Sequence, residues 1–193
     1  MVCPLPVDPA LSHLSSDVPI EIHPTTDLVD IEKGDADVAV RFAHHAPNAH
    51  FCERLMDDEW FPVAAPGYLE RIGASAGHEA FRQASLLAHT RQPWQPWLEK
   101  AGLTTQAARR TMTFSDTGFM LDAALRLQGI ALGRRSLVHD LLRTGALVRV
   151  SEISLHCEQS YYLLATERAA IAPHGRTVIR WIQALCAGSQ VQA

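Results

Sequence analysis

The residues best suited to chemistry in this sequence are a cation and several hydroxyl groups at the expected ends of buried strands. Arg41 interrupts the apolar run from Val38 to Phe42, a run that predicts a strand covered on both faces. A guanidinium at the carboxyl end of a strand in an open α/β sheet is well placed to hold a ligand carboxylate. The alternative interpretation of Arg41 is a surface arginine that closes a strand.

Hydroxyl groups gather at two predicted strand-to-helix turns. Ser115 and Thr117 flank Asp116 after a strand that ends at Phe114. These three residues either cap the next helix or line a pocket at its amino end, where backbone N–H groups attract anions. Asp116 would repel an acidic ligand and should then point away from it. Thr25 and Thr26 pose the same choice between capping and binding at an earlier turn.

The sequence lacks the motifs that usually mark catalytic, nucleotide-binding and zinc-binding sites. The sequence contains no G-x-S-x-G, no P-loop and no G-x-G-x-x-G. The histidines of the segment HHAPNAH (44–50) lack the i, i+4 spacing of a zinc helix, and Pro47 makes the segment a loop. We therefore predict no catalytic residue, no metal site and no cofactor.

Composition narrows the class of protein. The chain has 193 residues, 47% of them hydrophobic and 20% charged, with a formal net charge of −4. It has no Lys/Arg-rich run, so nucleic-acid binding by this chain alone is disfavoured. It also has no apolar run near the roughly 20 residues that span a bilayer, and no signal-like start. Four scattered cysteines (Cys3, Cys52, Cys157 and Cys186) predict reduced thiols in a cytoplasmic protein.

Several elements must position these groups. Residues 18–22, a short helix ending at Gly34, and residues 38–42 predict a strand–helix–strand unit with a right-handed parallel crossover. Residues 51–65 predict two strands joined by an acidic turn at Asp57-Asp58. Trp94 and Trp97 flank a short helix, where local packing is the commoner role.

The second half alternates strands and helices. Gly129 is expected to end the helix that follows Thr117 and to lead into a strand at 130–132. Gly133, Arg134 and Arg135 lead into the next helix. The last helix starts near Pro173 and has an apolar stripe at i, i+3, i+4 and i+7: Val178, Trp181, Ile182 and Leu185.

The order of these segments resembles the effector-binding domain of LysR-type transcriptional regulators, in the subgroup typified by the glycine-cleavage activator and the β-lactamase regulator. The resemblance covers the chain from Pro9 to Leu185. It is carried by DLVDIEKGDADVAVRF (27–42), ERLMDDEWFPVAAPGYL (53–69), LLAHT (86–90) with W-x-x-W-L (94–98), FSDTGFMLDAALRLQGIALGRRSLV (114–138), and YYLL (161–164) with IRWIQAL (179–185).

This resemblance implies an α/β fold with two Rossmann-like lobes joined by two hinge strands, similar to type 2 periplasmic binding proteins. Lobe I would hold residues 1–62 and 164–193, and lobe II residues 63–163. The hinge strands would be Phe61–Ala65 and Tyr161–Leu164. The family's first strand is expected to be missing or reduced to the first five residues. The winged helix-turn-helix that precedes such domains is absent from this sequence, so DNA would be bound only through that additional domain.

The resemblance also implies a function. A small effector would bind in the cleft between the lobes, and the full-length protein would be a dimer or tetramer. The strand-end cation Arg41 adds the expectation that the effector carries a carboxylate. The candidate effector-binding residues lie near strand ends or hinges: Thr25, Thr26, Arg41, Phe42, His89, Thr90, Ser115, Thr117 and Tyr161. The alternatives are a solute-binding protein and a small two-lobed α/β enzyme.

Overall fold

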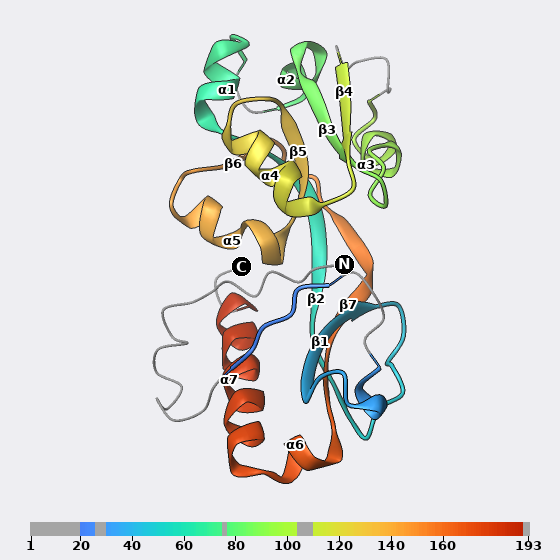
Figure 1. Cartoon of the computed structure of the whole chain (residues 1–193). Coiled ribbons are helices and arrows are strands. Elements are labelled where there is room, and N and C mark those ends of the chain that lie inside the picture. Colours follow the sequence, from blue (N-terminus) through green and yellow to red (C-terminus); the bar gives the residue numbers. More distant parts are fainter. Residues whose placement is uncertain (1–19, 26–29, 75–76, 104–109, 191–193) are drawn as a thin grey trace. The chain divides into compact units, whose positions relative to one another are not determined.

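The computed structural model describes residues 20–25, 30–74, 77–103 and 110–190 of the chain (Figure 1). The chain divides into two compact units: unit 1 comprises residues 1–58 and 157–193, and unit 2 comprises residues 59–156. Both boundaries fall inside long strands, β2 (Phe51–Ala64) and β7 (Leu155–Ala165). The domain limits implied by the resemblance, at 62/63 and 163/164, also fall inside these strands. The hinge residues within them stay a prediction.

Unit 1 contains an antiparallel ladder covered by helices. Its further elements are a 3₁₀ helix η2 (Ile31–Lys33), strand β1 (Val38–Ala43), helix α6 (Glu167–Ile171) and helix α7 (Pro173–Gln190). Strand β1 pairs with β7 from Val38 opposite Ala165 to Ala43 opposite Ser160. One face of this ladder packs on α7 through Leu163, Ala165, Ile179, Ile182 and Cys186 (Figure 1).

The strand predicted around Arg41 is confirmed, and so is its preceding glycine stop. Gly34 has a positive φ of 83°, and its N–H donates to the carbonyl of Ile31 at 3.0 Å. The parallel crossover predicted for residues 18–42 is not found among the described residues. Residues 20–25 carry no strand there, and β1 pairs with β7 in the antiparallel sense. Strand β1 therefore pairs with β7, which comes much later in the sequence, and this pairing was not expected from the local pattern.

The acidic turn predicted at Asp57-Asp58 is wrong, because β2 continues through both residues. Asp58 is 4% exposed. The Asp57 carboxylate accepts a hydrogen bond from the Ser160 hydroxyl on β7 at 2.6 Å and pairs with Arg54. The tertiary partner Ser160 and the nearby Arg54 satisfy the carboxylate inside a strand, so the local turn signal is overridden.

Unit 2 is a sheet covered on both faces. Its helices are α1 (Pro66–Arg71), α2 (His78–Gln83), α3 (Gln95–Lys100), α4 (Thr117–Leu125) and α5 (Arg135–Arg143). Its strands, besides part of β2, are β3 (Ser85–His89), β4 (Arg110–Phe114), β5 (Ile130–Arg134) and β6 (Val148–Arg149). Strand β3 is parallel to both β4 and β5, whereas β2 pairs with β5 and β6 in the antiparallel sense.

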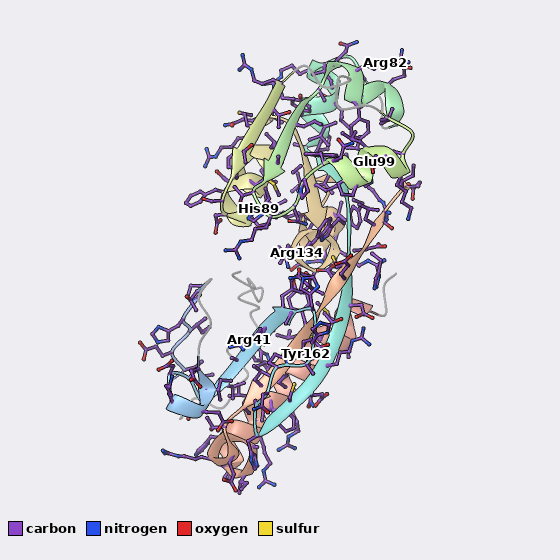
Figure 2. All side chains as sticks on the ribbon, turned by 90° about the vertical axis from the view of Figure 1, so that its right-hand side faces the viewer. Arg41, Arg82, His89, Glu99, Arg134 and Tyr162 are labelled. Atoms are coloured by element: carbon purple, nitrogen blue, oxygen red, sulfur yellow. The ribbon has the colours of Figure 1, made fainter. Side chains whose placement is uncertain are left out.

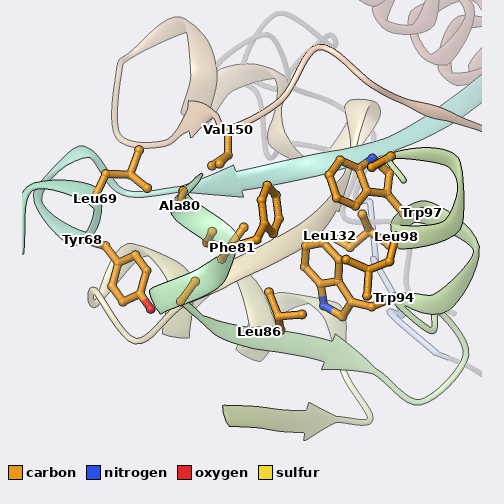
Figure 3. Close-up of a cluster of buried hydrophobic side chains, with 14 residues drawn as sticks. Tyr68, Leu69, Ala80, Phe81, Leu86, Trp94, Trp97, Leu98, Leu132 and Val150 are labelled. Atoms are coloured by element: carbon orange, nitrogen blue, oxygen red, sulfur yellow. The ribbon is translucent and has the colours of Figure 1, made fainter. Parts of the chain in front are cut away.

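Alternating residues of these strands build two separate cores. Leu86 packs with residues of α1, α2 and α3, and its neighbour Leu87 packs with α4 and α5 on the opposite face. The first core contains an aromatic cluster of Phe81, Trp94 and Trp97 (Figure 3). Both tryptophans are buried, which confirms the prediction of local packing.

Helix α4 ends earlier than predicted. Its last helical residue is Leu125, and Leu127, not a glycine, adopts the left-handed conformation with φ 62°. Gly129 serves a different purpose, because a Cβ atom there would lie 2.5 Å from the carbonyl oxygen of Ser85. Close approach of the chain to β3, rather than a helix cap, requires a glycine at this position. None of the helices built by described residues is long and apolar enough to cross a bilayer.

Candidate functional site

In unit 1 the β1–β7 ladder decides which candidate residues share a face. Arg41 lies opposite Tyr162, and Phe42 lies opposite Tyr161. Since successive strand residues point to opposite faces, Arg41 and Phe42 point away from each other. The Phe42 and Tyr161 rings are in contact, with centroids 4.6 Å apart and planes inclined at 40°. The predicted residues of unit 1 therefore form two groups rather than one.

The face that carries Arg41 also carries a tyrosine that sequence reasoning missed. Tyr162 is 8% exposed and packs with Ile31 and Leu164. Figure 2 shows Arg41 and Tyr162 on the paired strands β1 and β7. The sequence contains the doublet Tyr161-Tyr162, but only the strand register tells which ring shares a face with Arg41.

In unit 2 the candidate residues lie at the carboxyl ends of the parallel strands. Strand β3 ends at His89, β4 ends at Phe114, and β5 ends at Arg134. The Thr90 N–H donates to the Phe114 carbonyl at 2.9 Å, so the chain leaving β3 stays beside the end of β4. In α/β sheets this edge is where ligands bind. The fold thus brings His89, Thr90 and Ser115 to the same edge of the sheet.

His89 is the most constrained of these side chains. It is 7% exposed, its Nδ1 atom accepts a hydrogen bond from the Arg91 N–H at 3.1 Å, and its Nε2 atom lies 3.1 Å from the Ser115 carbonyl. A neutral ring that carries its proton on Nε2 satisfies both contacts, because Nε2 then donates to the Ser115 carbonyl and Nδ1 accepts from the Arg91 N–H. Burial, together with the charges of Arg134 and Arg91, lowers the pKa of His89, although the Ser115 carbonyl and Asp116 act in the opposite direction.

This lowered pKa predicts a loss of stability in mild acid. The unfolded chain binds a proton at His89 near pH 6.5, whereas the folded chain does so only at lower pH. The free energy of unfolding contributed by neutral His89 is therefore full above pH 6.5 and is lost as the pH falls from there to the folded-state pKa. Urea denaturation at several pH values between 7.5 and 5 should show this extra loss in the wild type and not in His89→Gln. The exposed His174→Gln serves as the control, and a His89→Gln profile equal to that of the wild type would contradict the prediction.

The start of helix α4 resolves the choice between capping and binding for Asp116. Its carboxylate accepts a hydrogen bond from the Phe119 N–H at 3.0 Å, so Asp116 is the N-cap. Ser115 is exposed, and Thr117 is the first residue of the helix. The two hydroxyl side chains are thus not required for this capping bond. They stay candidates for ligand contacts.

A buried cation in unit 2 was not predicted. Arg134 is 1% exposed at the end of β5, close enough to His89 to lower its pKa (Figure 2). The next residue, Arg135, instead pairs with Glu59 and is half-buried. The sequence signal was the pair of arginines directly after an apolar strand, which we read only as the lead into a helix.

Two candidates remain outside these groups. Thr25 is half-buried in unit 1, and Thr26 lies outside the described residues. Among the residues that the structure describes, no group of three His, Cys, Asp or Glu side chains is arranged to hold a metal ion. Cys52 and Cys186 are free thiols.

The protein family of this chain follows from its match to a known family profile. The profile of the LysR substrate binding domain matches residues 6–187, nearly the whole chain. The chain belongs to the LysR substrate-binding domain family. Proteins of this family bind small-molecule effectors and DNA and form oligomers, and this chain is a ligand-sensing regulatory domain. The family does not favour the alternatives of a transport-type binding protein or an enzyme.

Two curated relatives from Escherichia coli K12 are transcriptional regulators. The HTH-type transcriptional regulator DsdC is 28% identical over 148 residues, which is 71% of this LysR domain and 47% of DsdC. The glycine cleavage system transcriptional activator is 25% identical over 186 residues, which is 94% of this domain and 61% of the activator. The chain thus spans about half to three fifths of the length of these relatives.

Solved structures support the same fold. A substituted effector-binding domain from Citrobacter freundii superposes with a TM-score of 0.71 at 18% identity, covering 92% of this chain and 90% of that one. The effector domain of AmpR from Pseudomonas aeruginosa gives 0.63 at 22% identity, covering 83% and 77%. The mixed α/β architecture expected from the sequence is therefore confirmed as that of LysR effector domains.

Proposed function

We propose that this LysR domain senses a small metabolite that carries a carboxylate. The main support is Arg134, a cation buried at the carboxyl ends of the parallel strands of unit 2. A guanidinium binds a carboxylate through two parallel hydrogen bonds, and such a bond is stronger where water is excluded. His89 beside it is neutral at neutral pH and therefore does not repel this guanidinium.

Unit 1 is assigned a second set of effector contacts. Arg41 supplies a further cation, and Tyr162 on the same face supplies a phenol group. Phe42 and Tyr161 form an aromatic pair on the opposite face. This pair is assigned to recognition of the effector's shape and not of its charge. Because the two units carry different groups, each set can be tested separately with the same ligand.

The regulatory output is assigned to a longer protein. In this proposal a DNA-binding domain precedes the LysR domain, the protein works as a dimer or tetramer in the cytoplasm, and effector binding changes its affinity for DNA. A ligand that turns such a switch from mostly off to mostly on must bind one state more tightly by about 5.5 kcal/mol. The regulators among the relatives support this assignment.

A thermal-shift screen identifies the effector. Glycine and other amino acids form the first panel, because one relative activates the glycine cleavage system, and short peptides and cell-wall fragments form the second. A ligand that binds the folded state raises the melting temperature in proportion to the logarithm of its concentration above Kd.

Charge-removing variants then test the assigned residues against any hit. Arg134→Gln should weaken binding by about 30-fold or more, because it removes the partner of a carboxylate at a buried position. Arg41→Ala should also weaken binding. Arg126→Gln is the matched control, since this exposed arginine on the α4 C-cap pairs with Asp122. Isothermal titration gives the affinities, and unchanged affinity in Arg134→Gln would overturn the carboxylate assignment.

A further inference from the structure

Unit 2 contains a pocket of about 540 Å³ at the opposite end of its parallel strands from His89 and Arg134. Strand β3 begins at Ser85 and β4 begins at Arg110, and these two residues are paired in the ladder. The lining residues come from α1, α2 and the starts of both strands: Tyr68, Arg71, Ile72, Gln83, Ser85 and Arg110. The volume is in the range of pockets that bind metabolites.

The charges around this pocket have one sign. Arg71 and Arg110 line it, and no carboxylate is found among its lining residues in the described part of the chain. Among the residues that the structure describes, no Asp or Glu forms an ion pair with either guanidinium, whereas the exposed arginines Arg54, Arg82, Arg126 and Arg143 each pair with a carboxylate. Two unneutralised guanidinium groups in one concave site favour an anionic ligand.

Arg71 is held in place by two contacts. Its guanidinium lies 5.2 Å from the centre of the Tyr68 ring, and it donates a hydrogen bond to the carbonyl of Leu127, the residue with the left-handed backbone. A guanidinium has five N–H donors, so most of them stay available for a ligand. The last-turn carbonyls of α1 do not compete for them, because these carbonyls accept bonds from the N–H groups of residues 72–74.

The uncharged residues supply further donors. The Tyr68 hydroxyl accepts a hydrogen bond from the Ser85 N–H at 2.7 Å, which leaves its own proton to donate. The Gln83 amide and the Ser85 hydroxyl are the other polar side chains of the lining. Donors thus outnumber dedicated acceptors, as a phosphate or carboxylate group requires.

We propose that this pocket is a second ligand site, which binds a small metabolite through a phosphate or carboxylate group. It lies at the amino ends of β3 and β4, whereas the groups assigned to the effector in unit 2 lie at the carboxyl ends. The two sites share no residue. Occupation of the second site would therefore add an independent input to the same domain.

Side-chain NMR of the whole chain tests this site. The ¹⁵N-labelled protein is titrated at constant ionic strength with inorganic phosphate and, in a separate arm, with citrate, while the arginine Nε–H signals are followed. We expect saturable shifts at Arg71 and Arg110 with at least one of the two anions, and the better anion identifies the ligand group. The absence of saturable shifts in both arms would overturn the proposal.

Three variants separate a built site from general attraction of anions. Arg110→Gln and Arg71→Gln should each weaken binding of the better anion by about tenfold. Arg82→Gln removes the same charge from the neighbouring surface of α2, where Arg82 pairs with Glu79 at 3.6 Å, and should leave the affinity unchanged. An equal loss in Arg82→Gln would show nonspecific binding and refute the site.

The outcome is independent of the proposed effector function. Arg110→Gln should leave the thermal shift produced by any effector hit intact, whereas Arg134→Gln should leave phosphate or citrate binding intact. Since Arg71 also contacts Leu127, the melting temperature of Arg71→Gln is measured as well. Arg110, which is exposed at the start of β4, decides the test if Arg71→Gln is unstable.

Discussion

Gly175→Ala should lower the free energy of unfolding by about 3 kcal/mol or more. Gly175 lies in the first turn of α7, where that helix meets α6. A Cβ atom at this position would lie 2.0 Å from the carbonyl oxygen and 2.7 Å from the carbonyl carbon of Ala169. Both atoms belong to the backbone of α6, so no side-chain rotation relieves the overlap. Helix α6 must move away from α7, and the packing of both helices on unit 1 is weakened.

Gly67→Ala is the matched control for this prediction. Gly67 also lies in the first turn of a helix, α1, but a Cβ atom there would be 3.6 Å from the Leu127 side chain, which is ordinary contact. This change should be neutral or stabilise the protein by up to about 1 kcal/mol, because alanine loses less backbone entropy in a helix. Guanidinium denaturation followed by circular dichroism measures both variants. Equal stability of Gly175→Ala and the wild type would show that α6 and α7 do not meet as described.

Trp97→Ala should cost about 3–5 kcal/mol, the usual range for removing a buried aromatic side chain. Trp97 is fully buried, stacks on Phe81 with centroids 5.0 Å apart, and meets Trp94 edge-on at 5.7 Å (Figure 3). Its indole N–H donates to the carbonyl of Ile153 at 2.8 Å. The variant therefore leaves a cavity in the core of unit 2 and removes the hydrogen bond to the Ile153 carbonyl.

Two further variants separate these contributions. Trp97→Phe keeps part of the stack and loses the hydrogen bond, so it should cost less than the alanine variant, about 1–3 kcal/mol. Phe119→Ala, at a side chain that is 73% exposed, should change stability by no more than about 0.5 kcal/mol. The same denaturation measurement applies, and a Trp97→Ala cost as small as that of Phe119→Ala would contradict the packing described here.

Local patterns predicted those elements in which local and tertiary preferences agree. The segment from Val38 to Phe42 is apolar, β-rich and preceded by a glycine stop, and it forms β1 as expected. The Asp116 cap and the start of α4 were among the predicted alternatives. In each case one short stretch of sequence contains the cap, the stop and the periodicity.

Predictions failed where a distant partner decides the outcome. Asp57 and Asp58 have the composition of a turn, but Ser160, 103 residues after Asp57, pairs with Asp57 inside a strand. The order Tyr161-Tyr162 does not reveal which ring faces Arg41, because a shift of one residue in register exchanges the two faces. Arg134 and Arg135 are likewise equivalent in sequence, yet only the first is fully buried. For the candidate site, the sequence thus predicts the strand ends but not the pairing of side chains.

The division of the chain has a consequence for its synthesis. Unit 2 is one continuous segment, whereas unit 1 joins residues 1–58 to residues 157–193. On the ribosome, the apolar face of β1 stays uncovered until β7 and α7 have been translated, roughly 7–30 s later at usual elongation rates of about 5–20 residues per second. Until then the nascent chain carries all of unit 2, whereas unit 1 still lacks β7 and α7. Chaperones that bind exposed apolar strands would therefore bind β1 at Val38 and Val40.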